Sequence, residues 1–187
     1  MTPFKAAALL SVCFAFVAAP PSGAGGAQRV VATEKATVRV KGRQSVVVRE
    51  RGRAHTLDLT KHIDAARIQE ASVIFMTRAG GATYLLLDVC GMSKDTSDDR
   101  QCGAGIECNV VWLKLDRAWR VADARNIRYE SCWAPVTSDE GPKVAGRRLT
   151  LTVEDLRDEV RREVSYDADR PEAGLTINES AIPKSDP

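Results

Sequence analysis

The sequence predicts a mainly β protein, an antiparallel β-sandwich or open barrel with at most one short helix near residues 153–164. Several segments alternate between apolar and polar residues, as strands with one buried face do. Turns that contain glycine separate these segments at short intervals, which is typical of antiparallel all-β domains. Four cysteines remain after residue 27, an even number that suits a small exported domain with two disulfides.

The first 27 residues have the order of a secretory signal peptide. Lys5 precedes an uninterrupted apolar stretch, Ala6–Ala19, and small residues follow as far as Ala27. This stretch is shorter than the roughly 20 residues that cross a bilayer, and no later apolar run approaches that length. We therefore expect the mature protein to be secreted or periplasmic and to have no transmembrane segment.

Length and charge limit the remaining possibilities. Residues 28–177 suit a single domain, and residues 178–187 are expected to form a loose tail. The whole chain has 27 Lys and Arg, 25 Asp and Glu and a formal net charge of +2. A dedicated nucleic-acid-binding protein is usually strongly basic, so we expect no nucleic-acid partner.

The first half of the mature chain has the signals of consecutive strands. A short helix could begin at Thr60, although the apolar stripe of Thr60–Glu70 is weak. Ala79-Gly80-Gly81 is expected to form the turn between the last two strands. The expected strands are Thr37–Lys41, Ser45–Arg53, His55–Leu59, Ser72–Thr77 and Thr83–Cys90.

One pairing register follows from the residues between Tyr84 and Trp133. If Tyr84–Cys90 pairs antiparallel with Cys108–Leu115 so that Cys90 faces Cys108, apolar residues collect on one face of the pair. A shift of one residue would mix the two faces, so the pattern itself selects this register. The apolar face would pair Leu85 with Leu113 and Leu87 with Val111, and the second, partly exposed face would pair Tyr84 with Lys114 and Leu86 with Trp112.

The same register predicts the disulfides. It joins Cys90 to Cys108, and a further strand at Arg120–Tyr129 would bring Cys132 back to Cys102. The other two connectivities of four cysteines stay open. Zinc is the alternative partner of the thiols, but five residues separate Cys102 from Cys108 and no histidine lies near them. We therefore favour Cys90–Cys108 and Cys102–Cys132 and expect no metal site.

A polar, glycine-rich segment, Gly91–Glu107, is expected to form a long loop. Loops of this length in compact domains commonly have a function, and two disulfides would hold this one in place. Tyr84, Trp112 and Lys114 beside it form the candidate binding surface, because aromatic side chains contribute much of the contact energy of such sites. Packing in the core is the alternative for the two rings. The acidic residues of the loop, whose spacing matches no calcium-binding loop, are Asp95, Asp98 and Asp99.

The C-terminal third allows two structures. Arg147–Val153 alternates as a strand, and apolar residues then recur at helical spacing as far as Val164. Alternatively, the chain turns at residues 157–159 and returns as a second strand over residues 160–167. A short strand, Leu175–Ile177, is expected to follow.

Two regions carry opposite charge. Residues 29–53 include eight basic and two acidic side chains, whereas residues 154–179 include nine acidic side chains and four arginines. Arg39, Lys41 and Arg43 would share one strand face and could bind a polyanion, such as a cell-wall polymer, lipid headgroups or a sulfated glycan. The alternatives are protection of an exposed sheet edge and pairing with the acidic region.

No catalytic motif is present. The chain contains no Gly-x-Ser-x-Gly, no His-Glu-x-x-His and no phosphate-binding glycine loop, and its thiols are expected to be oxidised. His55 and His62 are expected to be surface or capping residues. We therefore expect no catalytic residue and no cofactor, and predict a binding or interaction module whose partner is a protein, a glycan or an envelope polyanion. The alternatives are a small exported hydrolase that uses paired carboxylates and a purely structural envelope protein.

Overall fold

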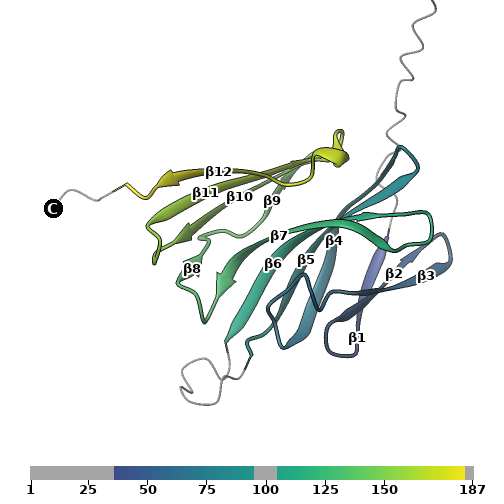
Figure 1. Cartoon of the computed structure of the whole chain (residues 1–187), viewed down its shortest axis with the longest axis horizontal. Coiled ribbons are helices and arrows are strands. Elements are labelled where there is room, and N and C mark those ends of the chain that lie inside the picture. The colour runs from purple at the N-terminus through teal and green to yellow at the C-terminus, as the bar shows by residue number, and fades with distance from the viewer. Residues whose placement is uncertain (1–35, 95–104, 184–187) are drawn as a thin grey trace, which may run out of the picture.

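The computed structural model describes residues 36–94 and 105–183, which form three antiparallel sheets (Figure 1). The N-terminal sheet contains β1 (Thr37–Lys41), β2 (Ser45–Glu50) and β3 (Arg53–Asp58) in that order. The central sheet contains β4 (Arg67–Ala79), β5 (Ala82–Met92), β6 (Ile106–Leu115) and β7 (Val121–Ser131) in that order. The C-terminal sheet contains β8 (Val136–Thr137), β9 (Lys143–Ala145), β10 (Arg148–Asp155), β11 (Val160–Asp167) and β12 (Thr176–Ala181). Its strand order is β12-β11-β10-β8, and β9 also pairs with β10. The predicted fold class, mainly β with antiparallel sheets, is confirmed.

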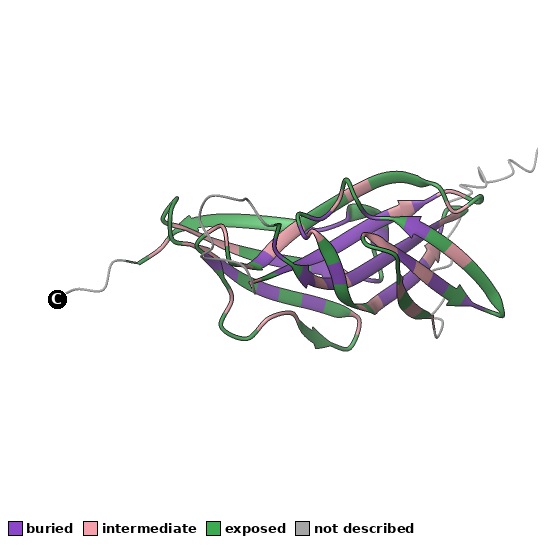
Figure 2. Cartoon of the chain, turned by 90° about the horizontal axis from the view of Figure 1, so that it is seen from below, coloured by how far each residue is buried: buried purple, intermediate pink, exposed green. Residues whose placement is uncertain are grey.

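The central sheet is covered on both faces. One face contributes Leu85 and Leu87 to a core shared with the N-terminal sheet. The other face contributes Leu86 and Trp112 to a second core, shared with the C-terminal sheet. Figure 2 shows buried residues along the strands between the two outer layers. As a consequence, β6 is buried without interruption from Glu107 to Leu113.

Strands β5 and β6 pair in the predicted register. Cys90 lies opposite Cys108 and Leu87 opposite Val111, and the other predicted pairs are in place as well. The predicted disulfide between Cys90 and Cys108 is confirmed. Cys132 is also disulfide-bonded, but its predicted partner, Cys102, lies outside the described residues, so that pairing stays a prediction.

The second face of this strand pair is buried, which corrects the prediction that it is partly exposed. Tyr84 and Trp112 are only 3% and 1% exposed. The short 3-10 helix η2 (Pro171–Ala173) lies on this face, and the Trp112 indole N–H donates to the Pro171 carbonyl oxygen at 3.0 Å. The Arg125 guanidinium lies 5.7 Å from the centre of the Trp112 ring. The candidate surface of Tyr84, Trp112 and Lys114 is therefore not an open binding surface, because its two rings belong to a core.

Residues 153–164 form a β-hairpin rather than a helix. β10 and β11 pair from Arg148 opposite Asp167 to Asp155 opposite Val160, with the turn at residues 156–159. The backbone N–H groups of Arg157 and Asp158 donate to the Asp155 carboxylate and close this turn. β12 then pairs with β11 as far as Ala181, so residues 178–181 belong to the sheet and not to a loose tail.

The short helix considered at Thr60 does not form. The chain turns after Leu59, where the His62 N–H donates to the Leu59 carbonyl oxygen at 2.8 Å, and it enters β4 at Arg67. The Thr60 backbone N–H is satisfied by the Asp58 carboxylate at 2.9 Å, so it needs no helical partner.

Both ends of the predicted loop, Gly91–Glu107, belong to strands, because β5 extends through Met92 and β6 begins at Ile106. Its two ends are tied by Glu107, a buried residue whose carboxylate accepts a 2.8 Å hydrogen bond from the Ser93 hydroxyl. The same carboxylate accepts a 3.2 Å hydrogen bond from the Cys132 backbone N–H. The three aspartates of the loop lie outside the described residues.

Trp112 holds the η2 segment against the central sheet, so its truncation tests this packing. We expect Trp112→Ala to lower the free energy of unfolding by about 3–5 kcal/mol, because it leaves a cavity in a filled core. Trp112→Phe keeps a ring but removes the donor to Pro171, and it should cost only about 1–2 kcal/mol. Urea denaturation measures both values, and an alanine variant as stable as the wild type would contradict this packing.

Candidate functional site

Three hairpin turns gather at one end of the molecule, on the right in Figure 1. They connect β2 to β3, β4 to β5 and β6 to β7. The first two are tight turns in which Arg51-Gly52 and Gly80-Gly81 have positive φ angles, the geometry that two-residue hairpin loops favour. The third contains residues 116–120. Each turn has an arginine in it or next to it.

A cleft of about 290 Å³ lies among these turns, between the N-terminal and central sheets, and we call it the hairpin cleft. β2 and β3 supply its lining from one side, and the β4–β5 and β6–β7 turns supply it from the other. The lining side chains that carry charge or rings are Glu50, Arg53, His55, Arg78, Asp116, Arg117 and Trp119.

An aromatic stack forms one wall of the hairpin cleft. The His55 and Trp119 rings lie parallel, with centroids 3.8 Å apart and an angle of 2° between their planes. Trp119 has a φ of 62°, a left-handed backbone that is unusual for a bulky residue. His55 therefore packs on a ring that belongs to the central sheet's last turn, which corrects the expectation that it is a surface or capping residue.

The Asp116 carboxylate fixes the turn that presents Trp119. It accepts hydrogen bonds from the backbone N–H groups of Ala118 at 2.8 Å and Arg120 at 2.9 Å, and it pairs with the Arg120 guanidinium at 2.7 Å. These hydrogen bonds, first the one from the Arg120 backbone, lower the pKa of Asp116. Asp116 is thus an ionised part of the turn, and Arg120 offsets its charge.

Two of the arginines of the hairpin cleft have free charges. Glu50 is only 6% exposed, and its carboxylate forms an ion pair with Arg78 and lies 3.9 Å from His55 Nε2. Arg53 and Arg117 are exposed and have no ion-pair partner in the part of the chain that the structure describes. The hairpin cleft therefore offers two guanidinium groups to a ligand, next to a third that is already paired.

Gly81 lets Arg117 approach the turn between β4 and β5. A Cβ atom on Gly81 would lie 3.3 Å from Arg117 Nη2, and its φ of 80° is a conformation that other residues rarely adopt. Glycine at this position therefore serves both the turn and the placement of the guanidinium.

A second cleft, of about 510 Å³, contains two carboxylates near the disulfide. Glu70 and Asp88 line it together with residues of β1. The Tyr129 hydroxyl donates to Asp88 at 2.8 Å and lies 3.5 Å from the Cys90 sulfur. Burial raises the pKa of Asp88, and the neighbouring Glu70 raises it further. Burial also raises the pKa of Tyr129, so the phenol stays protonated and remains the donor.

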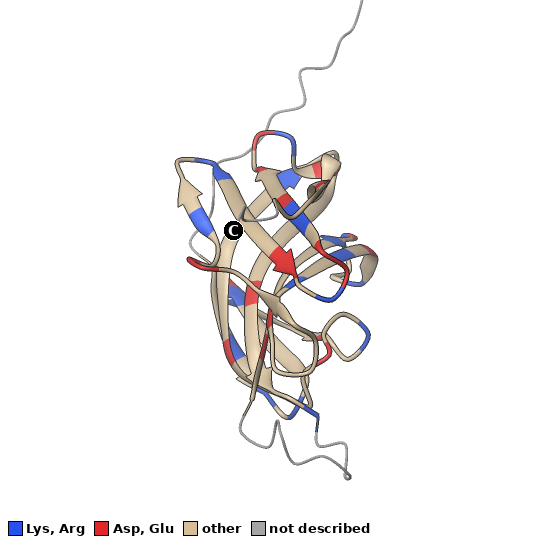
Figure 3. Cartoon of the chain, turned by 90° about the vertical axis from the view of Figure 1, so that its left-hand side faces the viewer, with Lys and Arg blue, Asp and Glu red and all other residues tan. Residues whose placement is uncertain are grey.

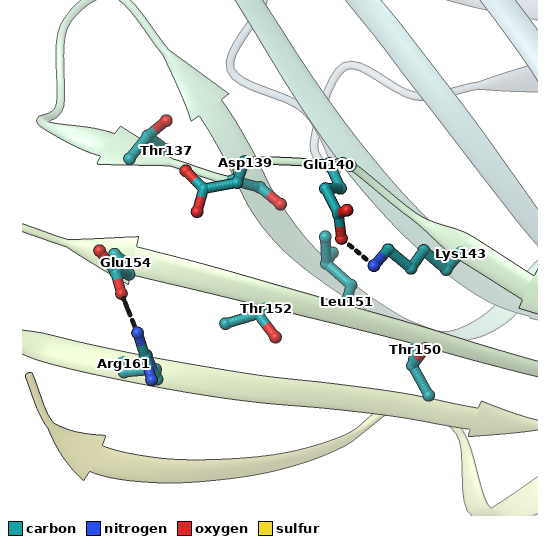
Figure 4. A pocket seen from close by; sticks show the side chains of 11 residues that line it. Thr137, Asp139, Glu140, Lys143, Thr150, Leu151, Thr152, Glu154 and Arg161 are labelled. Carbon is teal, nitrogen blue, oxygen red and sulfur yellow. Dashed lines mark hydrogen bonds and ion pairs between the residues drawn. The ribbon is translucent and has the colours of Figure 1, made fainter.

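A third cavity, of about 340 Å³, lies between β10 and the segment that joins β8 to β9 (Figure 4). Its charges are largely satisfied within the site. Glu154 pairs with Arg161 at 2.6 Å, and Glu140 pairs with Lys143, as the dashed lines in Figure 4 mark. This cavity has fewer free charges to offer a ligand than the hairpin cleft.

The acidic C-terminal region pairs with arginines of its own sheet. Arg162 contacts Asp155 at 3.3 Å and Glu179 at 2.8 Å, and Arg147 contacts Asp169 at 2.5 Å. Figure 3 shows basic and acidic residues mixed along the strands at this end. These carboxylates are therefore not the partners of the basic N-terminal sheet, which was one of the alternatives considered for its charge.

No protein-family model, curated protein or solved structure matches this chain. Within residues 36–94 and 105–183, His, Cys, Asp and Glu side chains form no group of three or more that could hold a metal ion. Over the same residues, no helix is long and apolar enough to cross a membrane.

The raised pKa of Asp88 makes stability depend on pH with a definite sign. The folded protein holds the Asp88 proton more tightly than the unfolded chain does, so this residue costs stability as the pH rises above its ordinary pKa of 3.8. Asp88→Asn removes that cost and keeps an oxygen that accepts from Tyr129. We expect its stability relative to the wild type to be greater at about pH 7 than at about pH 3, measured by urea denaturation.

Asp58→Asn is the matched control, because its sign is opposite. Hydrogen bonds from Thr60, first from its side chain, lower the pKa of Asp58. Asp58 therefore adds to the stability of the wild type as the pH rises, and the Asp58→Asn variant should become less stable relative to the wild type over the same range. Equal pH dependence of the two variants would contradict the assignment for Asp88.

Proposed function

We propose that this protein is a secreted or periplasmic binding module whose hairpin cleft recognises an anionic group, such as a phosphate, sulfate or carboxylate. The observation that carries the proposal is the pair of unpaired arginines, Arg53 and Arg117, on either side of a recess with a stacked aromatic wall. Arginine presents a planar fork of donors that matches the oxygens of these anions. A recess lined by unpaired cations favours binding over a purely structural role.

The hairpin cleft can attract anions without a large cost in folding stability, because one of its arginines is neutralised by a neighbouring carboxylate. Glu50 neutralises Arg78, so three guanidinium groups can lie near one another with less mutual repulsion. Trp119, which lines the cleft and stacks on His55, supplies an aromatic ring that a ligand with a ring or chain can contact. A cleft of about 290 Å³ suits one anionic group and its attachment better than a large folded ligand.

Export is the part of the proposal that rests mainly on sequence. The first 27 residues have the order of a signal peptide. The Cys90–Cys108 disulfide supports an oxidising compartment, because such bonds rarely persist in a reducing cytosol.

Calorimetric titration with inorganic phosphate at constant ionic strength tests the hairpin cleft. We expect Arg53→Ala/Arg117→Ala to bind phosphate at least about tenfold more weakly than the wild type, since a hydrogen bond to a charged group contributes about 1.5–3 kcal/mol. Arg148→Ala/Arg157→Ala, which removes two exposed arginines from β10 and the β10–β11 turn, is the matched control and should bind as the wild type does. Equal binding by both double variants would refute the site.

Glu50→Gln should change the phosphate affinity of the hairpin cleft in the opposite direction. It keeps a side chain of nearly the same shape but removes the negative charge that pairs with Arg78. Phosphate affinity should therefore rise, by about two- to tenfold in the same titration. A decrease, in a variant whose circular dichroism shows it to be folded, would mean that Arg78 does not face the ligand.

A small hydrolase is the second candidate function, and one observation favours it. The second cleft holds two carboxylates, Glu70 and Asp88, and the pKa of Asp88 is raised, as a general acid requires. The proposal ranks below anion binding because Asp88 already accepts a hydrogen bond from Tyr129, which gives it a structural partner. Release of nitrophenolate from a panel of nitrophenyl glycosides, abolished by both Glu70→Gln and Asp88→Asn, would support hydrolysis. No release by the wild type would count against it.

A further inference from the structure

We infer that the ligand of the hairpin cleft is a linear polyanion, a flexible polymer with repeated phosphate, sulfate or carboxylate groups, and that it continues over the outer face of the N-terminal sheet. This inference rests on the proposed function, because the cleft would hold one anionic group of the polymer. It adds a second contact surface and names the class of ligand.

The outer face of the N-terminal sheet carries a row of cations. On β1, Val38 and Val40 point inward to the core, whereas Arg39 and Lys41 are exposed on the opposite face. On β2, Arg49 is exposed on that same face, since Val46 and Val48 point inward. The row is therefore Lys41, Arg39 and Arg49.

The row leads to the β2–β3 turn, and the hairpin cleft lies on the other face of the sheet beside this turn. Arg39 lies opposite Val47, so Arg49 is its diagonal neighbour, one step closer to the β2–β3 turn. Alternate residues on a strand, and diagonal neighbours on adjacent strands, lie about 7 Å apart. Beyond Arg49 the chain turns at Arg51-Gly52, and Arg53, which lies opposite Glu50, lines the hairpin cleft from the inner face of the sheet, so the polymer would pass around the β2–β3 turn. A flexible chain with anionic groups at comparable intervals can contact these cations in succession.

The cations of the row are free to bind. Arg39, Lys41 and Arg49 have no ion-pair partner within the described ranges, and Lys41 makes only a long 3.5 Å hydrogen bond to the Thr56 hydroxyl. The acidic residue on this face, Asp58, is at the end of the row remote from the cleft, and its carboxylate accepts hydrogen bonds from Thr60. The row can therefore attract an anion without first breaking an ion pair.

A polymer fits this surface better than a membrane does. Peripheral membrane binding normally combines basic residues with apolar side chains that enter the lipid. The large apolar residues that are exposed in the described part of the chain all lie outside the N-terminal sheet. The hairpin cleft is also recessed, so a chain can enter it more readily than a flat surface of headgroups can.

Long-chain inorganic polyphosphate is the probe, with inorganic phosphate as its single-group counterpart, and binding is measured at several salt concentrations. We expect the wild type to bind polyphosphate at least about tenfold more tightly than phosphate, because successive contacts act together. Arg39→Gln/Lys41→Gln/Arg49→Gln should lose about tenfold or more for polyphosphate and keep its phosphate affinity. The slope of log affinity against log salt should fall by about two, as expected when three cations no longer contact a linear polyanion.

Arg148→Gln/Arg157→Gln/Arg170→Gln is the matched control, with the same change of charge on β10 and on the turns that follow β10 and β11. If it weakens polyphosphate binding as much as the row variant does, the inference is overturned. Binding to phosphatidylglycerol vesicles without binding to polyphosphate also overturns it, in favour of a membrane. The phosphate titration tests the hairpin cleft and the row variant tests the outer face, so the result shows which proposal fails. Tighter binding of polygalacturonate than of polyphosphate would identify a carboxylate polymer as the source.

Discussion

The rest of the structure depends on a central sheet whose two faces must both be removed from water. An antiparallel sheet commonly packs on one face and exposes the other, which gives its strands alternating sequences. β6 is instead buried from Glu107 to Leu113, and each outer sheet covers one of its faces. The buried Trp112 indole N–H donates its hydrogen bond to a carbonyl oxygen of the η2 segment. β6 therefore leaves little for a ligand except the turn that follows it, whereas β7 is largely exposed and parts of β4 and β5 line the second cleft.

The hairpin cleft follows from this arrangement. It lies at the end of the core between the N-terminal and central sheets, where side chains from turns replace those from paired strands. A left-handed backbone at a bulky residue costs on the order of 1 kcal/mol or more, and Trp119 keeps it because Asp116 fixes the turn and His55 stacks on the ring. Because Glu50 holds Arg78, the cleft combines fixed charges with free ones.

The parts of this structure that could be predicted are those that neighbouring residues determine. The β5–β6 register was predictable because two adjacent segments alternate in phase and bring Cys90 opposite Cys108. The burial of Tyr84 and Trp112 was not, because the group that covers Trp112 lies 59 residues away. The spacing of the valines of residues 153–164 slightly favours a helix, whereas the strand-rich surroundings favour a hairpin. The hairpin forms because β10 pairs with β11 along its whole length and β12 pairs with β11 on its other edge. Arg53, Arg78 and Arg117 are far apart in sequence. The available signal was an arginine beside each of three turns that separate consecutive strands, which antiparallel pairing can bring to one end.

The order of the strands also constrains how the chain folds. Each strand of the central sheet pairs with its neighbour in sequence, so this meander can assemble through successive local closures of low entropic cost. The valines of the N-terminal sheet emerge earlier in the chain but find their apolar partners only when β4–β7 exist. We therefore expect the meander to act as the nucleus on which both outer sheets condense. The Cys90–Cys108 bond joins two neighbours within it, so oxidation can lock the nucleus before either outer layer docks.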